Sequence, residues 1–327
     1  MEGREIVQVQ SLCKRFGEIN AVDRLDFSVT EGEIFGFLGP NGAGKTTTIR
    51  MLVGLLRPDS GFTLIDGHDV LEEPVQAKQC VGVVPETSNL YGELSALENL
   101  IYVAQLYGMP KSEWMQRGEE LLKEFNLLDR KEGKFQGFSR GMKRSLTIAA
   151  ALVHRPRILF LDEPTTGLDV MGARGLRKII NNLKGKGVTI FLTTHYIQEA
   201  EDLCDRVAII VKGRIREIDT PEALKEKIKE TEVLEIQPQS VNSSLLQILE
   251  GLPSVEKVIP VENKIRLYGP SIHSSVCQIL NRLEEGGVKI KSVHTLIPTL
   301  EDAFVKLTGI DVETMRVDKP MKMGGMG

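Results

Sequence analysis

The sequence of 327 residues predicts an α/β fold built on a parallel sheet, followed by a smaller α+β domain. Two short segments, 34–38 and 158–161, are apolar throughout, which is the composition of parallel strands buried on both faces. A helical segment follows each of them, as in strand-helix-strand units. Beyond residue 226 the order becomes strand, helix, two strands, helix and strand, which is typical of a ferredoxin-like domain.

A glycine-rich loop follows the apolar segment 34–38 and precedes a helical segment. Its eight residues fit the pattern G-x-x-x-x-G-K-[ST]. Glycines let main-chain N–H groups approach a phosphate closely, and the start of a helix adds unpaired N–H donors and the positive end of its dipole. The lysine can reach the β- and γ-phosphates of a nucleotide, and the threonine hydroxyl can bind Mg²⁺. The phosphate site is therefore predicted at Gly39, Asn41, Gly42, Gly44, Lys45, Thr46 and Thr47.

Charged side chains follow two other apolar segments at the same predicted edge of the sheet. Segment 158–161 leads directly into Asp162 and Glu163, and segment 188–194 leads into His195. In open α/β sheets, ligands bind at the carboxyl ends of the strands. A carboxylate there can hold the Mg²⁺ that bridges nucleotide phosphates, so these three residues are predicted to be functional.

Two further regions surround this sheet. Segments 5–12 and 25–30 alternate apolar and polar residues, which predicts half-exposed antiparallel strands. Between 95 and 129, apolar residues recur at three- and four-residue steps, which predicts helices. A further helix is expected at 143–153, with Ser139 in the preceding segment as its N-cap.

Composition excludes several classes of function. The net charge of −4 gives no support to nucleic-acid binding, which favours a basic surface. No apolar run approaches the ~18 residues that cross a bilayer, and the N-terminus lacks the apolar core of a signal peptide. Four scattered cysteines without a C-x-x-C pair favour reduced thiols. A cytoplasmic location is predicted, and any membrane-spanning part is expected in another polypeptide.

Five motifs in this order resemble the ATP-binding-cassette (ABC) ATPases, over residues 5 to about 225. They are Gly39 to Thr46, Phe138 to Met142, Ile158 to Glu163, Gly167 to Asp169, and His195. The stretch from Phe138 to Arg144 and the ending from Pro298 to Gly309 are similar to the ATPases of multidrug and daunorubicin-type (ABC-2) exporters. The resemblance implies a P-loop NTPase fold with an antiparallel β-subdomain and a helical subdomain.

The resemblance also implies a head-to-tail homodimer with two ATP molecules at its interface. Lys45 and the loop amides would hold the phosphates, while Thr46 and Asp162 would position Mg²⁺. Glu163 would polarise the attacking water, and His195 would contact the γ-phosphate. From the partner subunit, the segment corresponding to Ser139 and Gly141 would close the site.

Three further roles come from the same resemblance. Phe16 falls where the family stacks an aromatic ring on adenine, and Asp169 would lie at the dimer interface. Glu86 stands where most members carry the glutamine that completes the Mg²⁺ shell; a carboxylate can still bind Mg²⁺ but cannot donate a hydrogen bond. The signature departs from Leu-Ser-Gly-Gly-Gln because Arg140 and Met142 replace its second glycine and its glutamine.

The function implied is that of an ATPase subunit that powers an export transporter through a separate membrane permease, at the inner face of the cell membrane. The alternative is a soluble single-cassette ATPase that acts on a non-membrane partner. A small GTPase is disfavoured because the nearest match to Asn-Lys-x-Asp, at 263–266, ends in arginine. The permease selects the transported substrate.

Three parts of the chain are expected. Residues 1–225 form the ATPase domain, 226–312 an accessory C-terminal domain, and 313–327 a disordered tail. The accessory domain contains no glycine-rich loop and no carboxylate pair at a strand end, so a role in assembly or regulation is expected for it.

Overall fold

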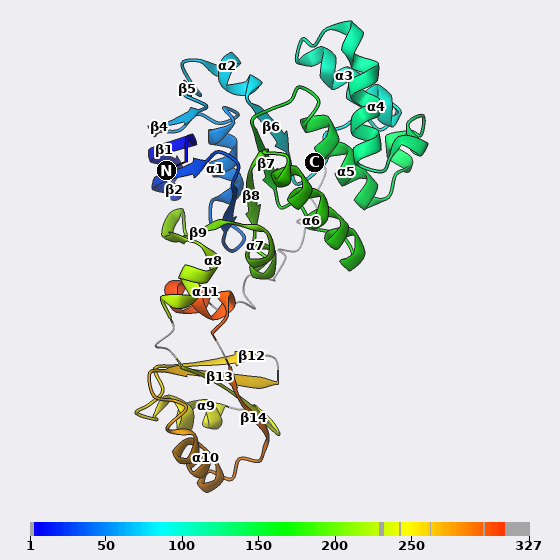
Figure 1. Ribbon diagram of the computed structural model, residues 1–327. Helices are drawn as coiled ribbons and strands as arrows, with labels where there is room; N and C mark the ends of the chain where they lie inside the picture. Colours follow the sequence, from blue (N-terminus) through cyan, green and yellow to red (C-terminus); the bar gives the residue numbers. More distant parts are fainter. Residues whose placement is uncertain (1–2, 229–231, 242, 262, 297, 311–327) are drawn as a thin grey trace, which may run out of the picture. The chain divides into compact units, whose positions relative to one another are not determined.

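A computed structural model describes residues 3–228, 232–241, 243–261, 263–296 and 298–310. These residues form two compact units, which divide between Ile218 and Asp219. Each unit is described by itself (Figure 1). The predicted disordered tail, 313–327, lies outside the described residues. Among the described residues, no helix is both long enough and apolar enough to span a bilayer.

The first unit contains a six-stranded sheet in the order β10-β9-β3-β8-β7-β6. The strands are β3 (Ile34–Leu38), β6 (Val81–Val84), β7 (Ile158–Asp162), β8 (Thr189–Thr194), β9 (Arg206–Val211) and β10 (Arg214–Asp219). The last of these crosses the division between the units by one residue. Strands β3, β8, β7, β6 and β9 pair in parallel. The apolar segments predicted as buried parallel strands are therefore confirmed, whereas β9 and β10 were not predicted.

The register of this sheet decides where the predicted site residues lie. Leu38 of β3 pairs with Thr194 of β8, and Asp162 of β7 pairs with Thr193 of β8. Because β8 lies between β3 and β7, the three loops that follow these strands leave the sheet side by side. Figure 1 shows α1 (Lys45–Leu52) starting at this edge, directly after the loop that follows β3.

The second sheet of this unit is antiparallel, in the order β2-β1-β4-β5. Its strands are β1 (Glu5–Phe16), β2 (Ile19–Thr30), β4 (Ser60–Ile65) and β5 (His68–Asp69). Phe27 of β2 stacks on Phe35 of β3 with ring centroids 5.6 Å apart, and its ring also lies near Phe37 and Phe191 of the parallel sheet. This aromatic cluster is the core that joins the two sheets, because each ring buries a large apolar surface.

The helices of the first unit include several that the sequence predicts and two, at 74–79 and 197–203, that were not predicted. The helices are α1, α2 (Pro74–Gln79), α3 (Ala96–Leu106), α4 (Trp114–Glu124), α5 (Arg140–Ala151), α6 (Val170–Gly185) and α7 (Ile197–Leu203). The prediction that α5 starts at residue 143 is wrong by one turn: Ser139 caps it, accepting from the Met142 N–H at 3.3 Å, so Gly141 lies inside the first turn. Figure 1 shows α3, α4 and α5 gathered at one side of the sheet, as the predicted helical subdomain.

The second unit contains a four-stranded antiparallel sheet in the order β12-β13-β11-β14. Its elements are α8 (Pro221–Glu226), β11 (Glu232–Pro238), α9 (Ser243–Glu250), β12 (Lys257–Val261), β13 (Lys264–Gly269), α10 (Val276–Glu285), β14 (Ile290–Leu296) and α11 (Leu300–Thr308). From β11 to β14 this is the predicted ferredoxin-like order. Apolar residues of α9 and α10, such as Leu249 and Ile279, pack with Leu234 and Leu267 on one face of the sheet.

The opposite face of this sheet is covered in part, which the sequence did not predict. Tyr268 Oη donates to Asp302 Oδ1 at 2.6 Å, and Arg266 Nη1 lies 3.5 Å from the same oxygen. Asp302 also accepts from the Thr299 N–H at 2.8 Å, so one carboxylate caps α11 and fixes it to β13. Helix α11 therefore covers part of this face. Helix α8 packs on α11 within the same unit.

Candidate active site at the edge of the parallel sheet

The loop after β3 curves in a way that requires glycine. Gly44 has φ of +107°, and a Cβ atom there would lie 2.4 Å from the carbonyl oxygen of Ala21. Helix α1 starts at the next residue, Lys45, with no side chain bonded to its first N–H groups. The loop thus leaves main-chain donors available at a helix N-terminus, which is the geometry that binds a phosphate.

Lys45 lies at the centre of the site rather than in solvent. Its ammonium donates to the carbonyl oxygens of Gly39 at 2.6 Å and Pro40 at 3.3 Å, and it is 3.0 Å from Oε1 of Glu163. The side chain is buried. A buried cation beside a buried carboxylate forms a strong ion pair when hydrogen bonds satisfy both groups.

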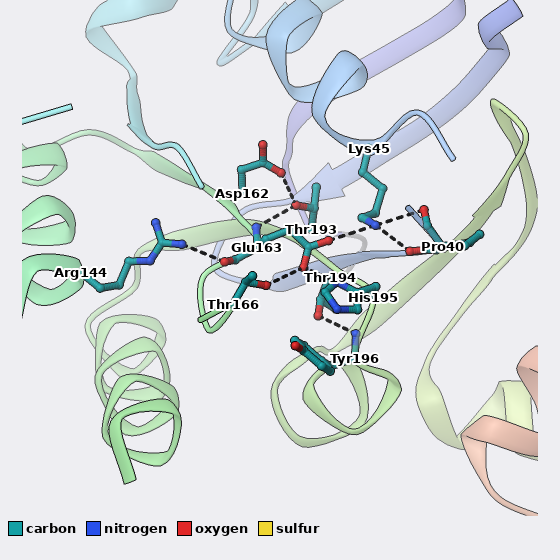
Figure 2. Close-up of polar contacts among 11 residues, drawn as sticks. Pro40, Lys45, Arg144, Asp162, Glu163, Thr166, Thr193, Thr194, His195 and Tyr196 are labelled. Atoms are coloured by element: carbon teal, nitrogen blue, oxygen red, sulfur yellow. Dashed lines mark hydrogen bonds and ion pairs between the residues drawn. The ribbon is translucent and has the colours of Figure 1, made fainter. Parts of the chain in front are cut away.

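Glu163 and His195, predicted from separate strands, contact each other directly. His195 Nδ1 lies 2.8 Å from Glu163 Oε2, and the Thr166 hydroxyl donates to the same oxygen at 3.3 Å. Figure 2 shows Lys45 and His195 converging on the Glu163 carboxylate from different elements. The structure therefore brings together one cation, one carboxylate and one imidazole at the edge where β3, β7 and β8 end.

The environment of Glu163 keeps its side chain ionised. Burial alone would raise the pKa of the Glu163 carboxyl, but the hydrogen bond with His195 and the positive charge of Lys45 outweigh it. The pKa of this carboxyl therefore lies below its usual value, and the group is a carboxylate at neutral pH. A carboxylate held in this way can accept a proton from, or orient, a water molecule beside it.

The main chain of Glu163 adopts an unusual conformation. Its φ is +48°, in the left-handed region that side chains other than glycine rarely occupy. The Glu163 N–H donates to the Thr193 carbonyl oxygen at 3.2 Å and to its hydroxyl at 3.1 Å. The Thr193 hydroxyl in turn donates to Asp162 Oδ1 at 2.6 Å. Such a conformation costs of order 1–3 kcal/mol, and it persists where surrounding contacts fix it.

Two residues at this edge were not predicted from the sequence. Thr193 lies within the segment 188–194, two positions before His195. The strand pattern of that segment gave the Thr193 side chain no separate role. Arg144 lies on α5 and is only 6% exposed, yet its guanidinium reaches the carbonyl oxygens of Pro85, Glu163 and Pro164. The sequence feature that could have indicated Arg144 is an arginine among the mostly apolar buried residues of a helix.

The remaining predicted residues lie around this centre. Thr46 and Thr47 are partly buried in the first turn of α1, whereas Asn41 and Gly42 are exposed in the loop. Phe16 ends β1 and is 49% exposed, with Lys14 Nζ 5.7 Å from its ring centroid, so it is not a core aromatic. Ser139 and Gly141 start α5, and no described contact joins them to Lys45, Glu163 or His195 of the same chain. Asp169 caps α6 by accepting from the Gly172 N–H at 2.7 Å.

The donor set of this edge fits a hard divalent cation. Asp162 is buried at the end of β7, Thr46 offers a hydroxyl, and Glu86 offers an exposed carboxylate after β6. Mg²⁺ prefers such oxygen ligands and usually takes few from the protein, completing its shell with water and substrate phosphates. The described residues contain no cluster of three or more His, Cys, Asp or Glu side chains that could hold a metal by themselves.

A parallel sheet with a phosphate loop after one strand and a carboxylate after another strand, one position further along the sheet than its neighbour, defines a P-loop nucleotide-hydrolysing protein. Comparison with known proteins gives the family: residues 22–166 match the ABC transporter family. The linearmycin resistance ATP-binding protein LnrL of Bacillus subtilis (strain 168) is 34% identical over 306 residues, which are 93% of this chain and 98% of LnrL.

Two further relatives show the same full-length similarity. The daunorubicin resistance ATP-binding protein DrrA3 of Streptomyces coeruleorubidus is 34% identical over 308 residues, covering 93% of this chain and 96% of DrrA3. The bacitracin transport ATP-binding protein BcrA of Bacillus licheniformis is 36% identical over 306 residues, covering 93% of this chain and 97% of BcrA. The chain therefore belongs to the ABC transporter family, among ATP-binding subunits of the resistance and export type.

Solved structures agree with this assignment. An ATP-binding subunit of an ABC transporter is 33% identical, with a TM-score of 0.62 over 68% of this chain and 92% of that one. A dimeric ATP-binding cassette in a post-hydrolysis state with ADP and phosphate is 26% identical, with a TM-score of 0.59 over 65% of this chain and 98% of that one. The predicted family, fold class and ATPase activity are confirmed: the chain is an ATP-hydrolysing subunit of an ABC transporter.

Proposed function

We propose that this chain hydrolyses ATP with Mg²⁺ to power export through a separate membrane permease, with its site at the edge formed by β3, β7 and β8. The observation that carries the proposal is the Glu163 carboxylate, fixed between Lys45 and His195. The loop amides and Lys45 bind the β- and γ-phosphates, and Glu163 orients and accepts a proton from the attacking water. His195 holds the Glu163 carboxylate and contacts the γ-phosphate.

Thr46, Glu86 and Asp162 would hold Mg²⁺ against the phosphates. When bound, the ion neutralises charge that builds up on the phosphate oxygens during transfer. Thr193 orients Asp162 through its hydroxyl. Phe16, exposed at the end of β1, supports adenine by stacking, which contributes ~1–3 kcal/mol per base in other systems.

We propose a homodimer in which each site is completed by the partner subunit. Ser139 and Gly141 lie at the N-terminus of α5, and Ser139 is exposed there. A helix N-terminus attracts the γ-phosphate of a nucleotide bound to the facing subunit. Val170 and Met171, which follow Asp169, are 80% and 73% exposed, and large apolar side chains so placed favour burial in an interface.

The permease is proposed to dock in a groove of the first unit. A cavity of about 830 Å³ lies between α2, β6 and the end of α3. Leu55, Val75 and Leu106 line it and are each about two-thirds exposed, at 69%, 65% and 66%. Exposed apolar side chains around one hollow fit the apolar face of a short helix. The relatives are transporter subunits, so we assign that helix to the cytoplasmic side of the permease, and the chain to the inner face of the membrane.

The domain limits belong to this proposal. Residues 1–225 form the ATPase domain, and 226–312 form an accessory domain that supplies no catalytic group. The alternative of a soluble cassette acting on a non-membrane partner is not favoured, because the transporter relatives match over 93% of this chain.

Replacing the proposed base tests the function directly. Glu163→Gln keeps the size of the side chain but removes the carboxylate, and loss of a general base costs ~10²–10⁴-fold in rate. We expect phosphate release from Mg²⁺-ATP to fall by that factor, while ATP affinity, measured by equilibrium binding, stays within about threefold. Glu72→Gln, a change at an exposed carboxylate, is the control. Turnover of Glu163→Gln within threefold of the unchanged protein would reject the proposed role.

A further inference from the structure

Arg144 is a buried cation on α5 whose contacts are with main-chain carbonyl groups. Its Nε donates to the Pro164 carbonyl at 2.8 Å, its Nη2 to the Glu163 carbonyl at 2.8 Å, and its Nη1 to the Pro85 carbonyl at 2.5 Å. Burial lowers the pKa of the guanidinium, and nearby acidic groups such as Asp162 oppose that effect. The group remains charged, since an arginine pKa lies far above neutral.

These three carbonyls belong to two segments that are distant in sequence. Glu163 and Pro164 follow β7, whereas Pro85 follows β6 and precedes Glu86. A planar guanidinium with five N–H donors in fixed directions can bind several carbonyls at once, whereas a lysine ammonium is a single point. Arg144 therefore holds two loop segments in one arrangement, from a helix that carries the signature residues at its start.

The contact with Glu163 matters because of the conformation of that residue. Its φ is positive, its N–H is held by Thr193, and its carbonyl is held by Arg144 and, at 3.2 Å, by the Thr166 N–H. The two sides of the Glu163 residue are thus fixed from β8 and from α5. A rotation of this main chain would move the carboxylate away from Lys45 and His195, because the side chain turns with its Cα–Cβ bond.

We propose that Arg144 is a positioning residue for ATP hydrolysis: its guanidinium fixes the main chain of Glu163 so that the carboxylate stays between Lys45 and His195. This inference rests on the proposed role of Glu163 as base. Arg144 itself contacts neither phosphate nor water in this role. Its removal therefore affects the hydrolysis step and leaves the binding of ATP by the phosphate loop unchanged.

Arg117 provides a matched control. It lies on α4 and is also partly buried, and its Nε and Nη2 donate to the carbonyls of Val153 and Leu152 at 3.1 and 2.8 Å. It therefore holds main-chain carbonyls just beyond the other end of α5, away from the site. Arg117→Lys removes the same kind of contact as Arg144→Lys and reports what general loosening of α5 does to the rate.

The test compares Arg144→Lys with Arg117→Lys in the full-length protein. A misplacement of about 1 Å in a catalytic group can lower the rate ~100-fold, so we expect kcat of Arg144→Lys to fall ~10- to 100-fold while KM for ATP stays within about twofold. Hydrogen exchange of the peptide covering 162–168 should rise about fivefold in Arg144→Lys and stay unchanged in Arg117→Lys. If Arg144→Lys does not fold, Arg144→Gln, which keeps two N–H donors, takes its place.

The outcomes separate this inference from the proposed function. If the unchanged protein hydrolyses ATP but the kcat of Arg144→Lys falls no further than that of Arg117→Lys, the positioning role is wrong and the ATPase assignment stands. A rise in KM that accounts for the whole loss of kcat/KM would also overturn it, because the arginine would then act on binding. If the unchanged protein does not hydrolyse ATP, the proposed function fails first.

Discussion

The carboxyl of Glu199 is buried near the edge of the parallel sheet that carries the proposed site. It lies on α7, one turn after His195, and is 3% exposed. Among the described residues, neither of its oxygens has a hydrogen bond of good geometry. Burial raises the pKa of this carboxyl, and the hydroxyls of Thr194 and Thr165 offset that effect only in part. The charge of Glu163 acts in the same direction as burial.

This raised pKa predicts a pH-dependent loss of stability. The folded protein binds the Glu199 proton more tightly than the unfolded chain, so stability is greatest below the unfolded pKa of about 4.3 and falls as pH rises through the folded value. Glu199→Gln is neutral at every pH. We expect it to raise the melting temperature more at pH 8 than at pH 5, measured by thermal unfolding. An equal shift at both pH values would contradict the prediction, and Glu72→Gln at an exposed carboxylate serves as control.

At the scale of single residues, the sequence indicated Lys45, Glu163 and His195 as candidates but not the contacts among them. Lys45 was expected to reach a phosphate, and the structure adds that it pairs with Glu163. Arg144 and Thr193 escaped prediction because their roles lie in binding main-chain groups of other segments, and a sequence motif does not show which carbonyl a side chain will reach.

At the scale of elements, the groove between α2, β6 and α3 leads to a prediction about docking. Leu106→Glu places a charge among exposed apolar side chains of the groove, away from the phosphate loop. Loss of a central apolar contact weakens binding by roughly 2 kcal/mol, about 30-fold. We expect the variant to bind membranes that contain the permease about 30-fold less tightly, measured by co-sedimentation, with ATP turnover of the isolated subunit within twofold.

The control for this prediction is another exposed apolar residue. Val241 lies in the second unit and is outside the groove, so Val241→Glu should leave membrane binding unchanged. Equal binding by Leu106→Glu and the unchanged protein would show that the permease docks elsewhere.

The sequence carries a signal for the start of helix α11 but does not indicate where in the fold the helix packs. Thr299 and Asp302 form a capping box, which is a sequence signal for a helix start. Asp302 also accepts a hydrogen bond from Tyr268 on β13, which lies 34 positions earlier in the sequence. The consequence is that the ferredoxin-like sheet carries a helix on a face that its strand order alone left open.

At the scale of the whole molecule, the proposed dimer predicts an ATP-dependent change of mass. Closure needs the γ-phosphate, and opening needs hydrolysis, so Glu163→Gln with ATP should accumulate as a dimer. Light scattering coupled to size-exclusion chromatography, with and without ATP, measures this. A monomer both with and without ATP, at ATP concentrations well above its Kd, would contradict the dimer.

A chain that ends at Asp219 keeps the phosphate loop, Asp162, Glu163 and His195, and should bind ATP within about twofold of the full chain.

The sequence by itself determined the fold class, the strands β3, β7 and β8 and the residues proposed for the chemistry. Apolar runs, glycine spacing and carboxylates at strand ends are local patterns, and they follow from burial and phosphate binding within a few residues. Only the tertiary structure decided which strands are neighbours: β8 lies between β3 and β7, so Lys45, Glu163 and His195 meet. It also decided that Thr193 and Arg144 hold Glu163 in a left-handed conformation, because such contacts depend on the packing of segments far apart in the chain.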